Sequence, residues 1–272
     1  MTGIQSFDLS GKRALVTGAA GLLGREHAAA LAEIGAEVIL TDIGAAQLDA
    51  AQSALGAKFG DRIRTAVMDV TSEESVRAVA AEVGAIDVLI NNAAIDPKVT
   101  ADNKGLELSR LEHFPLQEWD RQIAVGLSGA FLCSRIFGSG MAGRKSGAIV
   151  NIASDLAVIA PDQRLYRVDG RPAESQPVKP VTYSVIKTAL LGLTRYLAGY
   201  WADQGVRVNA LSPGGVYNNH PEEFVMRLSN LIPMGRMAEL SEYRAAVQFL
   251  SSPASSYLTG QNLVIDGGRS IL

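Results

Sequence analysis

The sequence contains a single cysteine, Cys133, among its 272 residues. An intrachain disulfide is therefore impossible, and we expect a cytoplasmic location, where cysteines stay reduced. The three histidines, His27, His113 and His220, lie far apart, and no Cys/His cluster has metal-ligand spacing. The sequence therefore gives no reason to expect a metal site.

Targeting segments, long apolar runs and a large excess of one charge are also missing. The first residues show no apolar stretch after a basic start, as a signal peptide would. No uncharged apolar run approaches the ~20 residues that span a bilayer. The 25 Lys and Arg residues against 28 Asp and Glu residues give a net charge of −3. This balance argues against nucleic acid or an anionic membrane as a partner and leaves a small molecule as the expected ligand.

The composition is that of a folded protein. Hydrophobic residues make up 47% of the chain and charged residues 19%, which excludes an intrinsically disordered protein. The length is sufficient for one large core, so we expect a single domain over residues 1–272.

Short apolar segments typical of strands alternate with longer segments typical of helices. The pattern predicts strands at residues 14–16, 37–40, 63–68, 86–90, 148–152, 206–211 and 263–265. It predicts helices at residues 22–34, 45–59, 72–83, 116–141, 181–201 and 241–250. Strands that are apolar on both faces and separated by helices indicate an α/β fold, a doubly wound parallel sheet with helices on both faces.

Two segments, 96–115 and 156–180, interrupt this alternation. Each follows a predicted strand, and the alternation resumes after each, so neither is expected to link two domains. Long insertions in a compact domain are usually functional loops, and ligands of such sheets bind beyond the carboxyl ends of the strands.

A glycine-rich turn follows the first predicted strand, with Gly18, Gly21 and Gly24 at its corners. Glycines allow a tight turn and close backbone approach to a pyrophosphate, and the following helix offers free N–H groups. Asp42 ends the second predicted strand, where a carboxylate binds ribose hydroxyls and repels a 2′-phosphate, which favours NAD over NADP. The alternatives are a turn without a ligand and a helix-capping Asp42.

Tyr183 and Lys187 are spaced i, i+4 on a predicted helix and share one face. A lysine cation near the phenol lowers its pKa, so that Tyr183 can exchange a proton with a substrate oxygen. Ser154 follows a predicted strand and can hydrogen-bond the same oxygen. The alternatives are an exposed Lys187 beside a half-buried Tyr183, and a Ser154 that caps a turn or helix.

These motifs, in this order and spacing, resemble the short-chain dehydrogenase/reductase family, whose fold is Rossmann-like with about seven strands. The further motifs are Asp69-Val70, Asn91-Asn92-Ala93-Ala94, Pro213-Gly214-Gly215-Val216 and Asp266-Gly267-Gly268. The resemblance implies that Ser154, Tyr183 and Lys187 are catalytic, with Tyr183 as the general acid/base. It also implies a dinucleotide site formed by Gly18, Gly21, Leu22, Leu23, Gly24, Asp42, Asp69, Val70, Asn91, Ala93, Tyr183, Lys187, Pro213, Gly214 and Val216.

The sequence departs from the family pattern in three places. Gly126 stands where the family has an asparagine that helps hold a water in the proton relay. Gly21 comes one residue earlier than the middle glycine of the commonest turn, so that Leu22 takes the usual place of that glycine. The segment between Ser154 and Tyr183 is longer than usual, and it contains Arg164.

This longer segment is charged and has few large apolar residues, which favours a polar, sugar-like substrate over a steroid or long acyl chain. An arginine such as Arg164 can hold a phosphate in a bidentate pair, so a sugar phosphate is one candidate. The alternative is a solvated loop or a subunit contact. The segment also resembles bacterial family members that take part in carbohydrate biosynthesis.

The leading interpretation is an NAD(H)-dependent oxidoreductase that interconverts a secondary alcohol and a ketone. Alternatives are a 3-oxoacyl thioester reductase of the same family, and an NAD-binding protein whose catalysis is impaired at Gly126. The resemblance also implies a homotetramer or a homodimer.

Overall fold

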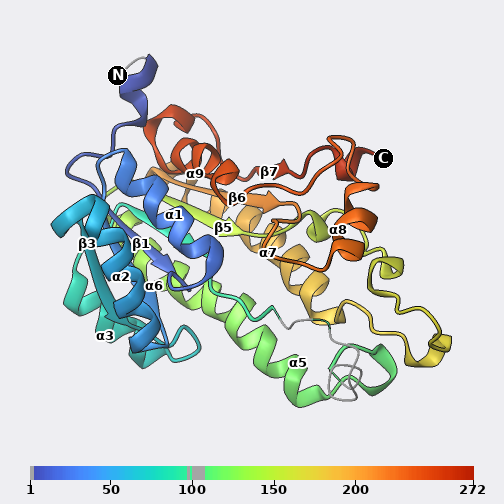
Figure 1. Ribbon diagram of the computed structural model, residues 1–272. Coiled ribbons are helices and arrows are strands. Elements are labelled where there is room, and N and C mark those ends of the chain that lie inside the picture. The colour runs from blue at the N-terminus through green and yellow to red at the C-terminus, as the bar shows by residue number, and fades with distance from the viewer. Residues whose placement is uncertain (1–2, 97–98, 100–107) are drawn as a thin grey trace.

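The computed structural model describes residues 3–96, 99 and 108–272 (Figure 1). Seven strands form one parallel sheet in the order β3-β2-β1-β4-β5-β6-β7. The strands are β1 (Arg13–Thr17), β2 (Glu37–Asp42), β3 (Ile63–Val67), β4 (Val88–Asn91), β5 (Gly147–Ile152), β6 (Val206–Pro213) and β7 (Asn262–Ile265). The predicted fold class and strand number are confirmed, whereas the division into domains stays a prediction.

Helices cover both faces of the sheet. They are α1 (Leu22–Glu33), α2 (Ala45–Phe59), α3 (Glu73–Val83), α5 (Leu116–Ile123), α6 (Gly129–Gly143), α7 (Val181–Trp201), α8 (Glu222–Ser229) and α9 (Arg244–Ser251). Alternate residues along each strand point to opposite faces, so Ala14 and Val16 pack against α1, α2 and α9, while Leu15 packs against α3, α6 and α7. The inner strands are therefore buried on both sides, as their apolar sequences require.

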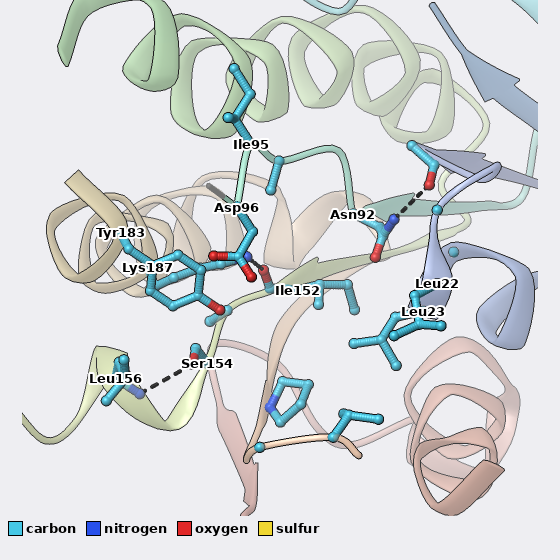
Figure 2. Close-up of a pocket in the computed structure, with 18 of the residues that line it drawn as sticks. Leu22, Leu23, Asn92, Ile95, Asp96, Ile152, Ser154, Leu156, Tyr183 and Lys187 are labelled. Atoms are coloured by element: carbon cyan, nitrogen blue, oxygen red, sulfur yellow. Dashed lines mark hydrogen bonds between the residues drawn. The ribbon is translucent and has the colours of Figure 1, made fainter. Parts of the chain in front are cut away.

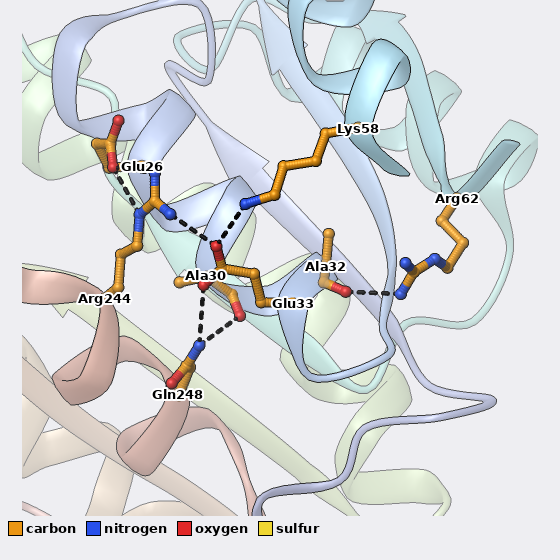
Figure 3. Close-up of polar contacts among 8 residues, drawn as sticks. All are labelled: Glu26, Ala30, Ala32, Glu33, Lys58, Arg62, Arg244 and Gln248. Atoms are coloured by element: carbon orange, nitrogen blue, oxygen red, sulfur yellow. Dashed lines mark hydrogen bonds and ion pairs between the residues drawn. The ribbon is translucent and has the colours of Figure 1, made fainter. Parts of the chain in front are cut away.

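Polar contacts hold the helices of one face together (Figure 3). Arg244 of α9 pairs with Glu26 at 2.7 Å and with Glu33 at 2.6 Å, both on α1. Lys58 of α2 pairs with the same Glu33 at 3.0 Å, and Gln248 donates to the carbonyl of Ala30 at 3.0 Å. These contacts fix α1, and with it the glycine turn at its N-terminus, between its two neighbours.

The predicted long helix 116–141 contains a π-helical turn, Ala124–Ser128, between α5 and α6. It is the one helix among residues 3–96 and 108–272 that is long and apolar enough to cross a membrane by length and composition. Its buried Cys133, Phe137 and Met141 pack in the sheet's hydrophobic core, as expected of a core helix.

The structure differs from the predicted helices at two further places. Helix α8 was not predicted, although it has two acidic residues in its first turn, a usual signal of a helix start. Helix α9 begins at Arg244 instead of residue 241, because residues Leu240–Tyr243 form a 3₁₀ turn closed by a capping box between Glu239 and Glu242.

The insertion 156–180 folds over the carboxyl ends of the strands and is tied to its neighbours (yellow in Figure 1). Arg110 donates to the carbonyls of Ala173 (3.0 Å) and Gln176 (3.2 Å). Leu165 packs with Leu228 of α8 in a small apolar cluster. Half of the other insertion, residues 97–98 and 100–107, lies outside the described residues.

Candidate active site

A cavity of about 790 Å³ opens at the carboxyl ends of the strands. Fifteen of the sixteen predicted site residues line it, namely Gly18, Gly21, Leu22, Leu23, Gly24, Asp42, Asp69, Val70, Ala93, Ser154, Tyr183, Lys187, Pro213, Gly214 and Val216. The chain therefore brings the glycine turn and the Ser/Tyr/Lys group into one cavity, at the edge where ligands of such sheets bind.

The glycine turn requires glycine for steric reasons. Gly18 has a φ of +62°, and a Cβ there would lie 2.8 Å from the Cα of Ala93. A Cβ on Gly24 would collide with the carbonyl oxygen of Gly18. The backbone of the turn can therefore approach a phosphate closely, and α1 begins at Leu22 with no side-chain cap on its free N–H groups.

Asp42 stands at the end of β2 and faces this turn. Its carboxylate accepts hydrogen bonds from the N–H groups of Ala20 (3.2 Å) and Gly44 (3.4 Å). The side chain is held against the glycine turn while it lines the cavity. This is the placement that a ribose-binding carboxylate needs, so the residues present fit an adenine dinucleotide.

Asn91 is the one predicted site residue that does not line the cavity. Its amide donates to Ser134 Oγ (2.9 Å) and to Asn151 Oδ1 (2.8 Å), inside the core. Asn92 takes its place, and its Nδ2 donates to the carbonyls of Thr17 and Gly18, both at 3.0 Å (Figure 2). Asn91 therefore ties β4 to β5 and α6, and Asn92 fixes the glycine turn.

Tyr183 and Lys187 lie on α7 beside Ser154, which follows β5 (Figure 2). Lys187 Nζ lies 5.7 Å from the centre of the Tyr183 ring and donates to the carbonyl of Ile152 at 2.7 Å. Burial lowers the pKa of Lys187 to about 8, although the charge of Asp96 opposes this effect. The ammonium is therefore anchored at the end of β5, and burial makes its charged form less favourable than that of an exposed lysine.

The predicted lowering of the Tyr183 pKa is not produced by the chain's own groups. Burial of the phenol raises the pKa of Tyr183 above its usual value, and the charge of Asp96 raises it further. A hydrogen bond with Ser154 acts in the opposite direction. Desolvation is the largest of these effects on the Tyr183 pKa.

A second lysine contacts the same phenol. Lys179 Nζ lies 3.9 Å from the centre of the Tyr183 ring and pairs with Asp96 at 2.6 Å. Both residues line the cavity, and Lys179 comes from the insertion 156–180. The sequence showed Lys179 as one charge of the insertion but gave no sign that it would reach Tyr183.

Ser154 is followed by a buried carboxylate. Its hydroxyl donates to Asp155 Oδ1 at 2.8 Å and accepts from the N–H of Leu156 at 3.2 Å. Asp155 in turn pairs with Arg269 at 2.7 Å. Arg269 directly follows the Asp266-Gly267-Gly268 motif but is distant from Asp155 in sequence, so the pattern of residues did not reveal this pair.

Gly126 lies buried in the π-helical turn. A Cβ there would be 2.8 Å from Cγ2 of Ile186, which stands between Tyr183 and Lys187 on α7. The family's asparagine would not fit at this position unless Ile186 moved. The side chain of Ile186 on α7 therefore occupies the space that a side chain at position 126 would need.

Arg164 does not line the cavity, contrary to the hypothesis of a phosphate clamp. Its side chain is 72% exposed and pairs with Asp162 at 2.5 Å, two residues away. From the same insertion, Pro161, Leu165, Tyr166 and Lys179 line the cavity instead. The near partner Asp162 holds the guanidinium outside the site.

Residues beyond β6 complete the cavity. Asn218, His220 and Phe224 line it, and the rings of His220 and Phe224 stack at 5.3 Å. Phe224 belongs to α8, the helix that the sequence reading missed. Neither Asn218 nor His220 was among the predicted site residues.

Comparison with known proteins places these features in a family. The family profile described as "short chain dehydrogenase" matches residues 12–166. The chain belongs to the short-chain dehydrogenase/reductase family. A second profile, described as "Enoyl-(Acyl carrier protein) reductase", matches residues 173–270. The family assignment made from the motifs is thereby confirmed, and the chain is an oxidoreductase that acts on CH–OH groups.

Three relatives illustrate the similarity. The chain is 39% identical to galactitol 2-dehydrogenase (L-tagatose-forming) of Cereibacter sphaeroides, over 97% of each sequence. It is 38% identical to D-threitol dehydrogenase of Mycolicibacterium smegmatis, over 97% of this chain and 95% of the relative. The crystal structure of a gluconate 5-dehydrogenase from Burkholderia cenocepacia, in complex with NADP and tartrate, matches with a TM-score of 0.83 and 29% identity over 98% of each chain.

Proposed function

We propose that the protein is an NAD(H)-dependent oxidoreductase that interconverts a secondary alcohol and a ketone on a polyol or sugar-like substrate. The observation that carries the proposal is the convergence of Ser154, Tyr183 and Lys187 in one cavity with the glycine turn and Asp42. The alcohol dehydrogenases among the relatives support the reaction class.

The dinucleotide would be held by the glycine turn and the N-terminus of α1 at its pyrophosphate, by Asp42 at its adenosine ribose and by Lys187 at its nicotinamide ribose. When bound, it supplies the hydride acceptor or donor of the reaction. Asp69 and Val70 would flank the adenine, and Pro213, Gly214 and Val216 would border the nicotinamide.

In alcohol oxidation, Tyr183 takes the proton of the substrate hydroxyl, and in ketone reduction it returns that proton. Ser154 holds the reacting oxygen, since its hydroxyl lines the same cavity beside the phenol. Lys187, fixed by the carbonyl of Ile152, holds its ammonium 5.7 Å from the centre of the Tyr183 ring. The chain's task is to align these groups and to move one proton at the Tyr183 oxygen.

Asp42 supports NAD over NADP, because its carboxylate would lie beside a 2′-phosphate and repel it. We expect Asp42→Ala to lose at least about tenfold in kcat/KM with NAD and to gain activity with NADP, since one charge-assisted hydrogen bond is lost and a like charge is removed. Asp49→Ala is the matched control, since that carboxylate is exposed on α2 and does not line the cavity. Equal use of NAD and NADP by the unaltered protein would contradict the preference.

A polar substrate is supported by the polar residues Asp96, Asn218 and His220 in the cavity wall and by the substrates in the relatives' names. The test is a panel of galactitol, D-threitol, gluconate and a 3-oxoacyl thioester, each with NAD(H) and NADP(H). Turnover of a polyol supports the proposal. Turnover of the thioester only, with NADPH, favours the alternative that matches the name of the second profile.

The third candidate, an NAD-binding protein with impaired catalysis, is supported by Gly126. Dinucleotide binding without turnover of any panel member would favour it. We further propose a homotetramer or a homodimer, and the cytoplasmic location stays a prediction.

A further inference from the structure

Asp96 and Lys179 form an ion pair beside Tyr183, in the wall of the cavity. Lys179 Nζ lies 2.6 Å from Asp96 Oδ1 and 3.9 Å from the centre of the Tyr183 ring. The charge of Asp96 also raises the pKa of Tyr183 and the pKa of Tyr166, another residue of the cavity wall. Asp96 is therefore near the phenol that would contact the reacting oxygen (Figure 2).

The stability of the fold does not account for this ion pair. The side chain of Lys179 is 11% exposed, but that of Asp96 is 60% exposed. An ion pair that has one partner largely in solvent contributes little to the free energy of unfolding. The place of Asp96 in the cavity wall therefore points to a role in binding.

The Asp96 carboxylate has an oxygen that a ligand can use. Oδ1 accepts from Lys179 at 2.6 Å, and Oδ2 receives no hydrogen bond from the residues that the structure describes. At Asp155, the other carboxylate in this part of the cavity, Oδ1 accepts from the N–H of Leu156 at 2.8 Å and Oδ2 accepts from Arg269 at 2.7 Å. A hydrogen-bond donor on a ligand therefore finds its acceptor more readily at Asp96 than at Asp155.

The cations that line the cavity are engaged in a different way. Arg121 and Arg269 each pair with a carboxylate at 2.7 Å, Lys179 pairs with Asp96, and Lys187 donates to a backbone carbonyl at 2.7 Å. A carboxylate or phosphate on the substrate would have to displace one of these partners. The cavity therefore suits a substrate that brings hydroxyl donors better than one that brings an anion.

A polyol carries such a donor next to its reacting carbon. Oxidation at one carbon leaves the hydroxyl group of the neighbouring carbon intact, and that group needs a hydrogen-bond partner once it leaves water. A hydrogen bond to an ionised carboxylate is shorter and stronger than one between neutral groups. An alcohol with a single hydroxyl group cannot make this second contact.

We propose that Asp96 is a substrate-binding residue that accepts a hydrogen bond from the hydroxyl group next to the reacting carbon, and so selects vicinal diols over alcohols with one hydroxyl group. The inference rests on the proposed function, because it takes the oxygen at Tyr183 as the reacting one. It adds a specificity residue outside the Ser/Tyr/Lys group and the dinucleotide site.

The experiment compares two inhibitors of polyol oxidation, 2,3-butanediol and 2-butanol, which differ by the one hydroxyl group next to the first. Their inhibition constants are measured against the best polyol of the panel with saturating NAD, in the unaltered protein and in Asp96→Ala. The variant should bind the tightest stereoisomer of the diol about tenfold more weakly and should bind 2-butanol within about twofold of the unaltered protein, since a charge-assisted hydrogen bond is lost from the diol alone. The matched control is Asp169→Ala, which removes a 96% exposed carboxylate outside the cavity and should change neither constant.

Equal weakening of the two inhibitors, or no change in either, would overturn the proposal. An effect of the substitution on Tyr183 itself changes both constants alike, so it is not mistaken for the contact with the diol. Asp96→Asn keeps the shape of the side chain and gives the same comparison if the alanine variant does not fold. Tyr183→Phe is assayed in parallel, because its full activity would refute the proposed function, whereas inhibitors that respond alike to Asp96→Ala refute only this inference.

Discussion

His27 is fully buried on α1, and neither of its ring nitrogens has a hydrogen-bond partner among the residues that the structure describes. Burial lowers the pKa of His27 to about 3, and the charge of Lys187 acts in the same direction. The folded protein therefore keeps this imidazole neutral and bears the cost of an unsatisfied polar group.

We expect His27→Leu to raise the free energy of unfolding by about 1–2 kcal/mol at pH 7, because it removes a buried unsatisfied group at similar volume. The folded pKa lies below the usual value of 6.5, so the histidine costs stability as the pH falls from about 6.5 toward 3. Urea unfolding at several pH values measures both effects. If His27→Leu lost as much stability as the unaltered protein between about pH 6.5 and 3, His27 would not be the source of the acid sensitivity.

Asp96 is the residue whose charge has the largest electrostatic effect on Tyr183 and Lys187. It raises the pKa of both Tyr183 and Lys187. Replacement by asparagine should lower both pKa values, so both limbs of the pH profile of kcat/KM for polyol oxidation should move to lower pH. Asp169→Asn, an exposed carboxylate in the neighbouring insertion, is the control. A profile that stays in place, or that moves to higher pH, would show that Asp96 does not act on the phenol.

At the scale of elements, the sequence was sufficient to predict those features that are set by residues close together in the chain. The glycine turn, the spacing of Tyr183 and Lys187 and the strand–helix alternation are local patterns, and the structure places all of them as expected. Asn91 was misplaced because Asn91 and Asn92 adjoin at the end of β4, and the sequence does not say which of them turns inward. The pairs Asp155–Arg269 and Lys179–Asp96 could not be predicted, because each joins residues far apart in the chain.

The π-helical turn is another feature that depends on long-range packing. Gly126 allows α7 to approach this turn closely, and Ile186 fills the space that a side chain would take. We expect Gly126→Asn to lower the free energy of unfolding by about 1–3 kcal/mol through overpacking, and to lower kcat because Ile186 lies between Tyr183 and Lys187.

The matched experiment is a double-mutant cycle with Ile186→Ala, which removes Cγ2, measured by urea unfolding and by kcat. The two substitutions together should be less harmful than the sum of their separate effects, with a coupling of about 1 kcal/mol or more. Strict additivity would mean that Gly126 and Ile186 are not matched in this way.

At the scale of the whole molecule, the cavity is assembled from both halves of the chain. The glycine turn and Asp42 come from the first half, whereas Tyr183, Lys187 and Arg269 come from the second. Parallel strands bring these residues to one edge of the sheet, where the two insertions add their own side chains. The residues proposed to hold the dinucleotide and those proposed to hold the substrate are therefore neighbours by topology.

The outer faces of α6 and α7 carry exposed apolar residues, among them Phe131, Val185, Tyr196 and Tyr200. Such a face is suited to burial against another copy of the chain. We expect light scattering to show a tetramer or dimer. Tyr196→Glu should shift the distribution of oligomers toward smaller species without loss of dinucleotide binding. A monomeric unaltered protein would contradict this prediction.

The central claim is that the phenol of Tyr183 exchanges the proton of the reacting oxygen beside a bound dinucleotide. The most direct test is single-turnover formation of NADH from NAD and the best polyol, compared between the unaltered protein and Tyr183→Phe, with dinucleotide binding measured separately. We predict that the variant binds the dinucleotide normally and forms NADH at least about 100-fold more slowly, the usual scale of general acid–base catalysis. Normal NADH formation by Tyr183→Phe would contradict the account.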